Sequence, residues 1–241
     1  MSMDVIDHTH HCQALVGSDI QFAFQTIIDT NEQEVVGFEA LVRGIKNEPP
    51  AVVFSRIPHD QRFLFDQACR IRAMEAAEAF GIDSKLHLNC GEIKAGNVEL
   101  VAATTLHIAR RHNLDPANIV LELSNLDAIG NAAALEQVQT CLSAAGLTTL
   151  ADNFGHRDAN LRPVAGFRPQ RLKLAHKLVD GIDRNPESQA IVKAALAFCE
   201  QMNIRPMASG VERAEEFEWL QTAGVELFQG YFFAQPGMDA A

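Results

Sequence analysis

The sequence lacks a long apolar segment, a basic stretch and any cysteine pair spaced as Cys-x-x-Cys. No segment reaches the roughly 18 consecutive apolar residues of a transmembrane helix, and residues 1–12 are polar and acidic, unlike a secretory signal. We therefore expect a cytoplasmic protein that does not enter the membrane. The formal net charge of -11, without a basic stripe, argues against a DNA-binding surface.

The five cysteines are scattered along the chain, which argues against a disulfide framework. Near the N-terminus, four residues could bind a metal: His8, His10, His11 and Cys12. Because no second group of ligands accompanies them, we interpret residues 1–19 as a flexible, solvated leader. Residues 20–241 are then predicted to form a single domain.

The pattern of apolar residues predicts alternating strands and helices. Strand patterns at Ile20–Ile28 and Glu34–Arg43 are separated by a turn signal and predict a hairpin. Further strands are predicted over 85–89, 119–123, 148–152, 171–174, 204–208 and 225–228, and helices over 63–80, 98–112, 132–145, 160–164, 187–202 and 214–223. Residues 44–60 fit a loop or a short helix. This alternation is typical of parallel βα units, and the strands are short and apolar, as in a sheet covered by helices.

A closed β/α barrel is favoured over an open doubly wound sheet, because no glycine-rich phosphate-binding motif follows the first strand. Polar residues stand where the predicted strands end, which is where barrels build their sites. These residues are Glu39, Arg43, Asn89, Glu122, Asp152, Lys173, Ser209 and Gln229. Each one alone has a structural explanation, such as a buried ion pair or a turn cap. Carboxylates about 4 Å apart repel by roughly 4 kcal/mol at an effective dielectric of 20, so together they predict a cation. Oxygen ligands of this kind suit Mg²⁺, Mn²⁺ or Ca²⁺.

These residues, in this order, resemble the EAL domain, the phosphodiesterase domain of bacterial cyclic di-GMP signalling, over about residues 20–237. The motif that names the family reads Glu39-Ala-Leu-Val-Arg43. The other matching segments are Phe24-Gln25-Thr-Ile-Ile28, Leu88-Asn89, Leu121-Glu122-Leu-Ser124, Asp152-Asn-Phe-Gly155, Leu172-Lys173-Leu174, Ser209-Gly-Val-Glu212 and Gln229-Gly-Tyr-Phe-Phe233 with Pro236. The resemblance implies a TIM-like (β/α)8 barrel whose first strand runs antiparallel, in agreement with the hairpin.

The resemblance also implies roles for individual residues. Family members that hydrolyse cyclic di-GMP use two divalent cations to activate water for in-line attack, which gives linear pGpG. The first cation, Mg²⁺ or Mn²⁺, would be held by Glu39, Asn89, Glu122 and Asp152. Lys173 would orient or activate the water, so Lys173 and Asp152 are the catalytic residues if activity remains. The residues implied to hold the dinucleotide are Gln25, Leu41, Arg43, Asp66, Glu212, Gln229 and Pro236.

The departures from the family pattern lie mainly on the side of the second cation. Asn153 replaces the second of two aspartates, and Ser209 replaces a glutamate. Each missing charge forfeits about 4 kcal/mol of short-range attraction, or about three decades in affinity. We therefore expect the second cation site to be nearly empty at millimolar Mg²⁺. Supporting positions also differ, at Asn125, at Ala175 and in the loop 155–159.

Three interpretations stay open. The first is a degenerate EAL domain that acts as a cyclic di-GMP receptor. The second is a weak or Mn²⁺-dependent phosphodiesterase, in which the Asn153 carbonyl oxygen still coordinates and Glu212 swings in as a substitute ligand. The third is a module that works by contact with a protein partner, through helix faces and the loop 155–161, where a homodimer could also form. Residues of that loop, such as His156, could equally be solvated. Whether the chain stands alone or is part of a longer protein is also open.

Overall fold

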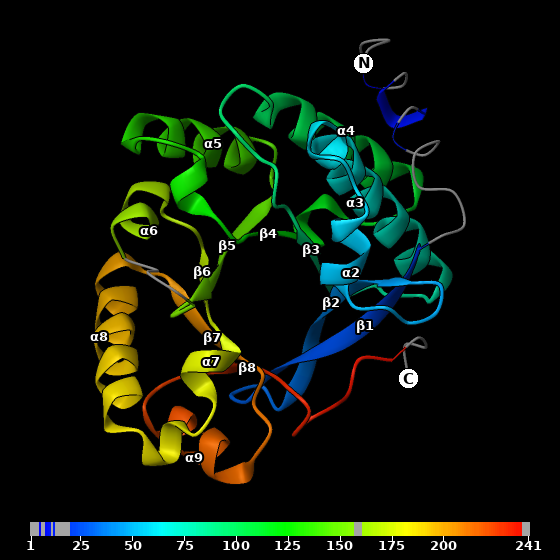
Figure 1. The fold of residues 1–241 in the computed structure, drawn as a ribbon. Coiled ribbons are helices and arrows are strands. Elements are labelled where there is room, and N and C mark those ends of the chain that lie inside the picture. Colours follow the sequence, from blue (N-terminus) through cyan, green and yellow to red (C-terminus); the bar gives the residue numbers. More distant parts are fainter. Residues whose placement is uncertain (1–4, 6–7, 11, 13–19, 157–160, 238–241) are drawn as a thin grey trace.

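The computed structural model describes residue 5, residues 8–10, residue 12, and residues 20–156 and 161–237. Within these residues, eight strands close into a barrel in the order in which they occur in the chain (Figure 1). The strands are β1 (Ile20–Asp29), β2 (Glu34–Gly44), β3 (Lys85–Asn89), β4 (Ile119–Leu123), β5 (Thr148–Phe154), β6 (Arg171–Leu174), β7 (Arg205–Ser209) and β8 (Leu227–Gln229). The predicted barrel is therefore confirmed.

The first strand runs antiparallel to both of its neighbours. It pairs with β2 from Ile20 opposite Gly44 to Asp29 opposite Glu34, and its end pairs with β8. All other neighbouring strands are parallel. The hairpin predicted from the turn signal is present, and Gly237, which follows β8, pairs with Phe24 on its first strand.

Helices cover the outside of the barrel (Figure 1). Their bounds are α2 (Pro50–Ser55), α3 (Arg62–Ala79), α4 (Val98–Arg111), α5 (Ala132–Ala144), α6 (Leu161–Phe167), α7 (His176–Val179), α8 (Pro186–Met202) and α9 (Ala214–Thr222). Local capping residues explain both ends of helix α8. The Asn185 side chain accepts from the backbone N–H groups of Glu187 and Ser188 at the start of α8, and Asn203 ends this helix in the left-handed conformation. None of the described helices combines the length and apolar character needed to cross a bilayer.

The apolar core has two parts. The larger part lies between the helices and the outer face of the sheet, and the smaller part consists of Ile27, Val120, Leu150, Met207 and Leu227. Each residue of the smaller part stands two positions from a polar residue on the same strand. Because side chains alternate across a strand, these residues share the inner face of the barrel with the polar residues at its mouth. The polar site therefore lies above these five apolar residues, which we call the apolar floor.

Some predicted bounds were wrong. Strand β5 continues past Asp152 to Phe154, and β7 and β8 begin and end later than predicted. The four-residue helix α7 was not predicted, since it is too short to give a periodic signal.

Five residues of the predicted leader are described. Val5, His8–His10 and Cys12 are helical, and Cys12 is fully buried in the larger apolar part of the core. The solvated tail predicted from the sequence therefore does not describe Cys12. Its Sγ lies 3.5 Å from His8 Nε2. His11 lies outside the described residues, and the division into a leader and a barrel at residue 20 stays a prediction.

Candidate functional site

A buried lysine stands at the centre of the barrel mouth. Lys173, on β6, is 3% exposed. Its Nζ lies 3.0 Å from Glu39 Oε2, 2.5 Å from Glu122 Oε2 and 3.8 Å from Asp152 Oδ1. These carboxylates come from β2, β4 and β5. The structure thus brings the three predicted carboxylates together around the predicted catalytic lysine.

Three amides complete this cluster. Gln229 Nε2 donates to Glu39 Oε2 at 2.7 Å and to Gln25 Oε1 at 3.0 Å. Asn89 Nδ2 donates to Glu39 Oε1 at 3.2 Å, which leaves Asn89 Oδ1 as the amide atom with a lone pair for a cation. Gln25 Nε2 donates in turn to the Ala234 carbonyl at 3.2 Å. We refer to Lys173, the three carboxylates and these three amides as the mouth cluster.

The mouth cluster holds more negative than positive charge. Burial, and then the Glu39 carboxylate, raise the pKa of Glu122 to about 8. Burial also raises the pKa of Asp152 to about 7, against the opposing effect of Lys173. For Glu39, burial acts in the same direction, but Lys173 and Gln229 outweigh it and lower the pKa to about 2. Raised pKa values show that an additional positive charge would be favoured here, either as a proton or as a cation.

A second buried layer lies beneath the carboxylates and was missed from the sequence. His87, on β3, is fully buried, and its Nδ1 lies 2.6 Å from Glu122 Oε1. Its Nε2 lies 3.0 Å from Arg171 Nη1. Burial, and then the Arg171 charge, lower the pKa of His87 well below its usual value. A signal was present, since His87 and Arg171 stand two residues before Asn89 and Lys173 and so share their face of the sheet.

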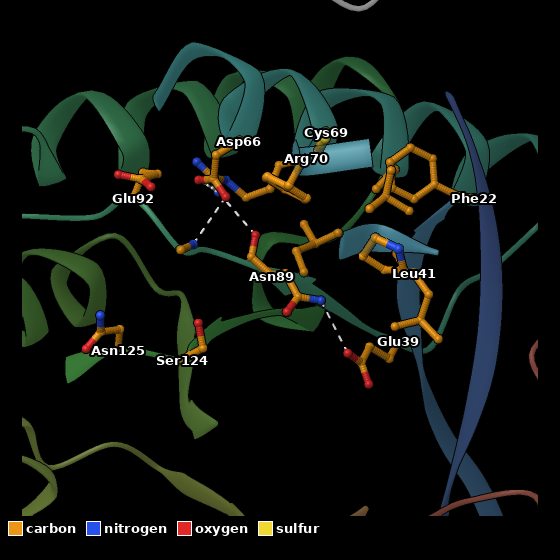
Figure 2. A pocket seen from close by; sticks show the side chains of 17 residues that line it. Phe22, Glu39, Leu41, Asp66, Cys69, Arg70, Asn89, Glu92, Ser124 and Asn125 are labelled. Atoms are coloured by element: carbon orange, nitrogen blue, oxygen red, sulfur yellow. Dashed lines mark hydrogen bonds and ion pairs between the residues drawn. The ribbon is translucent and has the colours of Figure 1, made fainter. Parts of the chain in front are cut away.

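A cavity of about 440 Å³ opens beside the mouth cluster (Figure 2). Glu39 and Asn89 line it on one side, and Asp66 and Arg70 from α3 line it on the other. Mostly apolar residues, Leu41 among them, line the remainder, together with the polar residues Glu92, Ser124 and Asn125. Two of the predicted ligand-binding residues, Leu41 and Asp66, therefore adjoin two of the predicted metal ligands.

The Asp66 carboxylate is held firmly. It forms an ion pair with Arg70, and its Oδ1 accepts from the Gly91 backbone N–H at 3.1 Å. Arg70 Nη1 also donates to the Asn89 carbonyl at 3.1 Å, so helix α3 is tied to the end of β3. The contact fixes the backbone that carries the Asn89 amide.

Three other predicted ligand-binding residues stand apart. In the described part of the chain, no hydrogen bond or ion pair of the mouth cluster reaches Arg43, Glu212 or Pro236. Arg43 Nη1 donates to the Val42 carbonyl at 2.9 Å rather than pairing with Glu39. Glu212 is exposed. Pro236 precedes Gly237, which pairs with Phe24 of β1.

The two replaced positions are occupied by protein contacts. Asn153 adopts a left-handed conformation with φ 62°, and its Nδ2 donates to Asp152 Oδ2 at 2.8 Å. Ser209 Oγ donates to the Leu174 carbonyl at 2.9 Å. Neither side chain brings a negative charge, and both are engaged with neighbours. The pair therefore lacks the charge that would attract a second divalent cation.

The first donor set fits a cation in its chemistry but is not preformed. Carboxylates and an amide oxygen are the ligands of hard divalent cations. No group of three or more His, Cys, Asp or Glu side chains is arranged to hold a metal ion anywhere in the described residues. The ammonium of Lys173 stands among the carboxylates, so it must move aside before their oxygens can share one cation.

A β/α barrel with polar residues at the carboxyl ends of its strands is the arrangement of barrel enzymes. The family model of the EAL domain matches residues 12–236, and the chain belongs to this family. The resemblance drawn from the motifs is therefore confirmed.

Three similar proteins are informative. A standalone versatile EAL protein from Vibrio cholerae O395, in a c-di-GMP-bound crystal structure, is 36% identical with a TM-score of 0.85, over 92% of this chain and 94% of that chain. BlrP1 from Klebsiella pneumoniae, in a manganese/cy-diGMP complex at pH 9.0, is 28% identical with a TM-score of 0.82, over 92% of this chain and 57% of that chain. The blue light- and temperature-regulated antirepressor BluF from Escherichia coli (strain K12) is 27% identical over 90% of this chain, which spans 54% of the length of BluF.

Proposed function

We propose that this chain is a cyclic di-GMP receptor of bacterial signalling, with one cation site retained and with hydrolysis weak or absent. The observation that carries the proposal is the contrast between the two sides of the barrel mouth. On one side Glu39, Glu122 and Asp152 converge, while on the other Asn153 and Ser209 bond to Asp152 and to a backbone carbonyl. Attack on a phosphodiester by the two-cation route needs both sides.

The retained cation, Mg²⁺ or Mn²⁺, would be held by Glu39, Asn89, Glu122 and Asp152. When bound, it would neutralise phosphate charge and lower the pKa of a coordinated water. Lys173 would leave the centre of the carboxylates and turn its ammonium towards the water or the phosphate. The manganese and cyclic di-GMP complex of BlrP1 supports the use of a divalent cation together with the dinucleotide.

The dinucleotide would lie across the mouth and into the adjoining cavity. Leu41 offers an apolar contact there, and Asp66 offers a carboxylate that can accept from a guanine edge. Arg43 would hold a phosphate, since its guanidinium is engaged with a single backbone carbonyl and can turn. The other residues assigned to the ligand are Gln25, Glu212, Gln229 and Pro236. The cyclic di-GMP-bound form of the similar Vibrio protein supports this ligand.

Calorimetry combined with product analysis tests the proposal. Cyclic di-GMP is titrated into the chain with Mg²⁺ or Mn²⁺, and the mixture is then separated by chromatography. A saturating isotherm with unchanged dinucleotide is the expected result. Heat that continues after each injection, together with pGpG, would instead identify the weak or Mn²⁺-dependent phosphodiesterase, in which Lys173 and Asp152 remain catalytic.

A role in protein contact is the second candidate, and the similarity to BluF, an antirepressor, favours it. An absence of heat at two temperatures, with the chain folded, would support this candidate over the receptor. Of the loop 155–161, which is predicted as its interface and as a dimer contact, residues 157–160 lie outside the described residues. Analytical ultracentrifugation with and without cyclic di-GMP measures whether a homodimer forms.

A further inference from the structure

The hydrogen bonds of the buried layer beneath the mouth cluster determine which ring nitrogen of His87 carries a proton. Arg171 Nη1 lies 3.0 Å from His87 Nε2, and a guanidinium can only donate, so Nε2 must accept. In a neutral imidazole the other nitrogen then carries the hydrogen. His87 Nδ1 therefore donates to Glu122 Oε1, at 2.6 Å.

The two oxygens of Glu122 consequently have different partners. Oε1 accepts from His87 inside the barrel, and Oε2 faces Lys173 at 2.5 Å in the mouth. Glu122 is fully buried and comes from β4, while His87 and Arg171 come from β3 and β6. A chain of hydrogen bonds across the barrel thus fixes the rotation of one carboxylate.

Burying His87 and Arg171 in this layer is unfavourable for the stability of the fold. Val120 is in register with His87, and Leu150 is in register with Arg171, and both are fully buried apolar residues. Apolar residues of similar volume at positions 87 and 171 would continue the apolar floor and spare the desolvation of a charge. A polar pair in this place is therefore better explained by what it does to Glu122 than by stability.

We propose that His87 is a positioning residue, whose Nδ1–H, fixed by Arg171, holds Glu122 Oε1 inside the barrel and presents Oε2 to the cation. The proposal rests on the first cation site of the proposed function. Partners that orient a metal ligand typically contribute ten- to a hundredfold to metal affinity. Loss of the Nδ1–H group should therefore weaken Mn²⁺ binding by about that factor.

The experiment compares Mn²⁺ affinity, measured by calorimetry, among the wild type and matched variants of the full chain. His87→Leu removes the donor, while His87→Asn keeps an N–H group at the same number of bonds from the backbone as Nδ1. Ile27→Val changes the same barrel interior without touching a polar group. We expect about a tenfold or greater loss for His87→Leu, recovery to within about threefold for His87→Asn, and no change for Ile27→Val.

A second readout needs no metal. Nitrogen-15 NMR of the histidine rings should show His87 with a protonated Nδ1 and an unprotonated Nε2. If His87→Leu does not fold, Arg171→Met replaces it as the test. This variant frees Nε2, so a mixture of tautomers and a Mn²⁺ affinity below that of the wild type are expected.

The outcomes separate the two proposals. If the wild type binds Mn²⁺ and His87→Leu binds it equally well, the positioning role is overturned while the cation site stands. If the wild type binds no Mn²⁺, the proposed cation site fails and the positioning role fails with it, although the tautomer remains measurable. A protonated Nε2 would overturn the positioning role by itself.

Discussion

Lys173 Nζ lies 2.5 Å from Glu122 Oε2, and both side chains are buried in the barrel mouth. The same ammonium lies 3.0 Å from Glu39, so one lysine offsets the repulsion between two buried carboxylates. The lysine stands at the point on which the predicted metal ligands converge. Binding of a cation and retention of this ion pair are therefore alternatives, and their competition can be measured.

Replacing the lysine tests this competition. Lys173→Met leaves the carboxylates buried without a positive partner, and breaking a buried ion pair costs about 3–5 kcal/mol. We expect the free energy of unfolding in EDTA to fall by about that amount and Mn²⁺ to restore part of it. Urea denaturation measures both effects. Lys193→Met is the control, because Lys193 lies on α8 over the Trp219 ring, away from the mouth. A loss of stability that Mn²⁺ does not reduce would argue against a shared cation site.

Arg43 should matter for ligand binding and not for folding. Arg43 is half-buried, and its guanidinium donates to the Val42 carbonyl. We expect Arg43→Ala to change the free energy of unfolding by less than about 1 kcal/mol, since Arg43 forms no ion pair with the described residues. Its affinity for cyclic di-GMP should fall at least about tenfold, because a charged contact to phosphate is worth about 1.5–3 kcal/mol. Arg56→Ala, which removes an exposed pair with Glu48, serves as the control in the same titration.

Restoring the two missing carboxylates tests whether their loss accounts for the weak hydrolysis that we propose. Asn153→Asp keeps the left-handed backbone accessible, since aspartate tolerates it as asparagine does. Together with Ser209→Glu it returns two charges, each worth about 4 kcal/mol of short-range attraction. We expect formation of pGpG to rise at least about tenfold above the wild type, with each single variant below the double. An inert double variant that still binds Mn²⁺ would place the defect in the loop after Gly155 or at Ala175.

An ion pair at the opposite end of the barrel gives a pH dependence of stability. Burial acts to raise the pKa of Asp29, but hydrogen bonds from Arg205 and the Asn31 backbone N–H outweigh it, so the pKa lies below its ordinary value. The stabilising contribution of the carboxylate is thus complete above the ordinary pKa and is lost as the pH falls through the lowered one.

Asp29→Asn should therefore lower the free energy of unfolding by about 1–2 kcal/mol at pH 7, and the difference from the wild type should shrink in acid. Urea denaturation from pH 7 to pH 3 measures it. Glu226→Gln, which alters the exposed partner of Arg205, should cost less. A difference independent of pH would show that the charge of Asp29 is not the cause.

The strands could be predicted closely because their pattern is local. The hairpin of residues 20–44 is written in two apolar runs and a turn signal, and the end of β3 at Asn89 was predicted to the residue. The carboxylates could be predicted as a group, since parallel strands deliver their carboxyl ends to one rim. Helix α7 could not be, because four residues carry no helical period.

The contacts of the buried layer could not be predicted from local sequence patterns. His87 and Arg171 are 84 residues apart in the chain, and the sequence around either residue does not indicate that the other is its hydrogen-bond partner. The placement of Lys173 was likewise beyond the sequence, which gave its type but not its position among the carboxylates. Such contacts depend on the closure of the sheet into a barrel and on the register of its strands.

By itself, the sequence determined the barrel, the family and the residues that gather at the mouth, because side-chain alternation and strand order follow from local spacing. The tertiary structure alone decided how those residues share their charges. Lys173 stands between Glu39 and Glu122, while Asn153 and Ser209 turn to neighbours in the protein. Electrostatic energy depends on distance and burial across different strands, and only the closed barrel brings those strands to hydrogen-bonding distance.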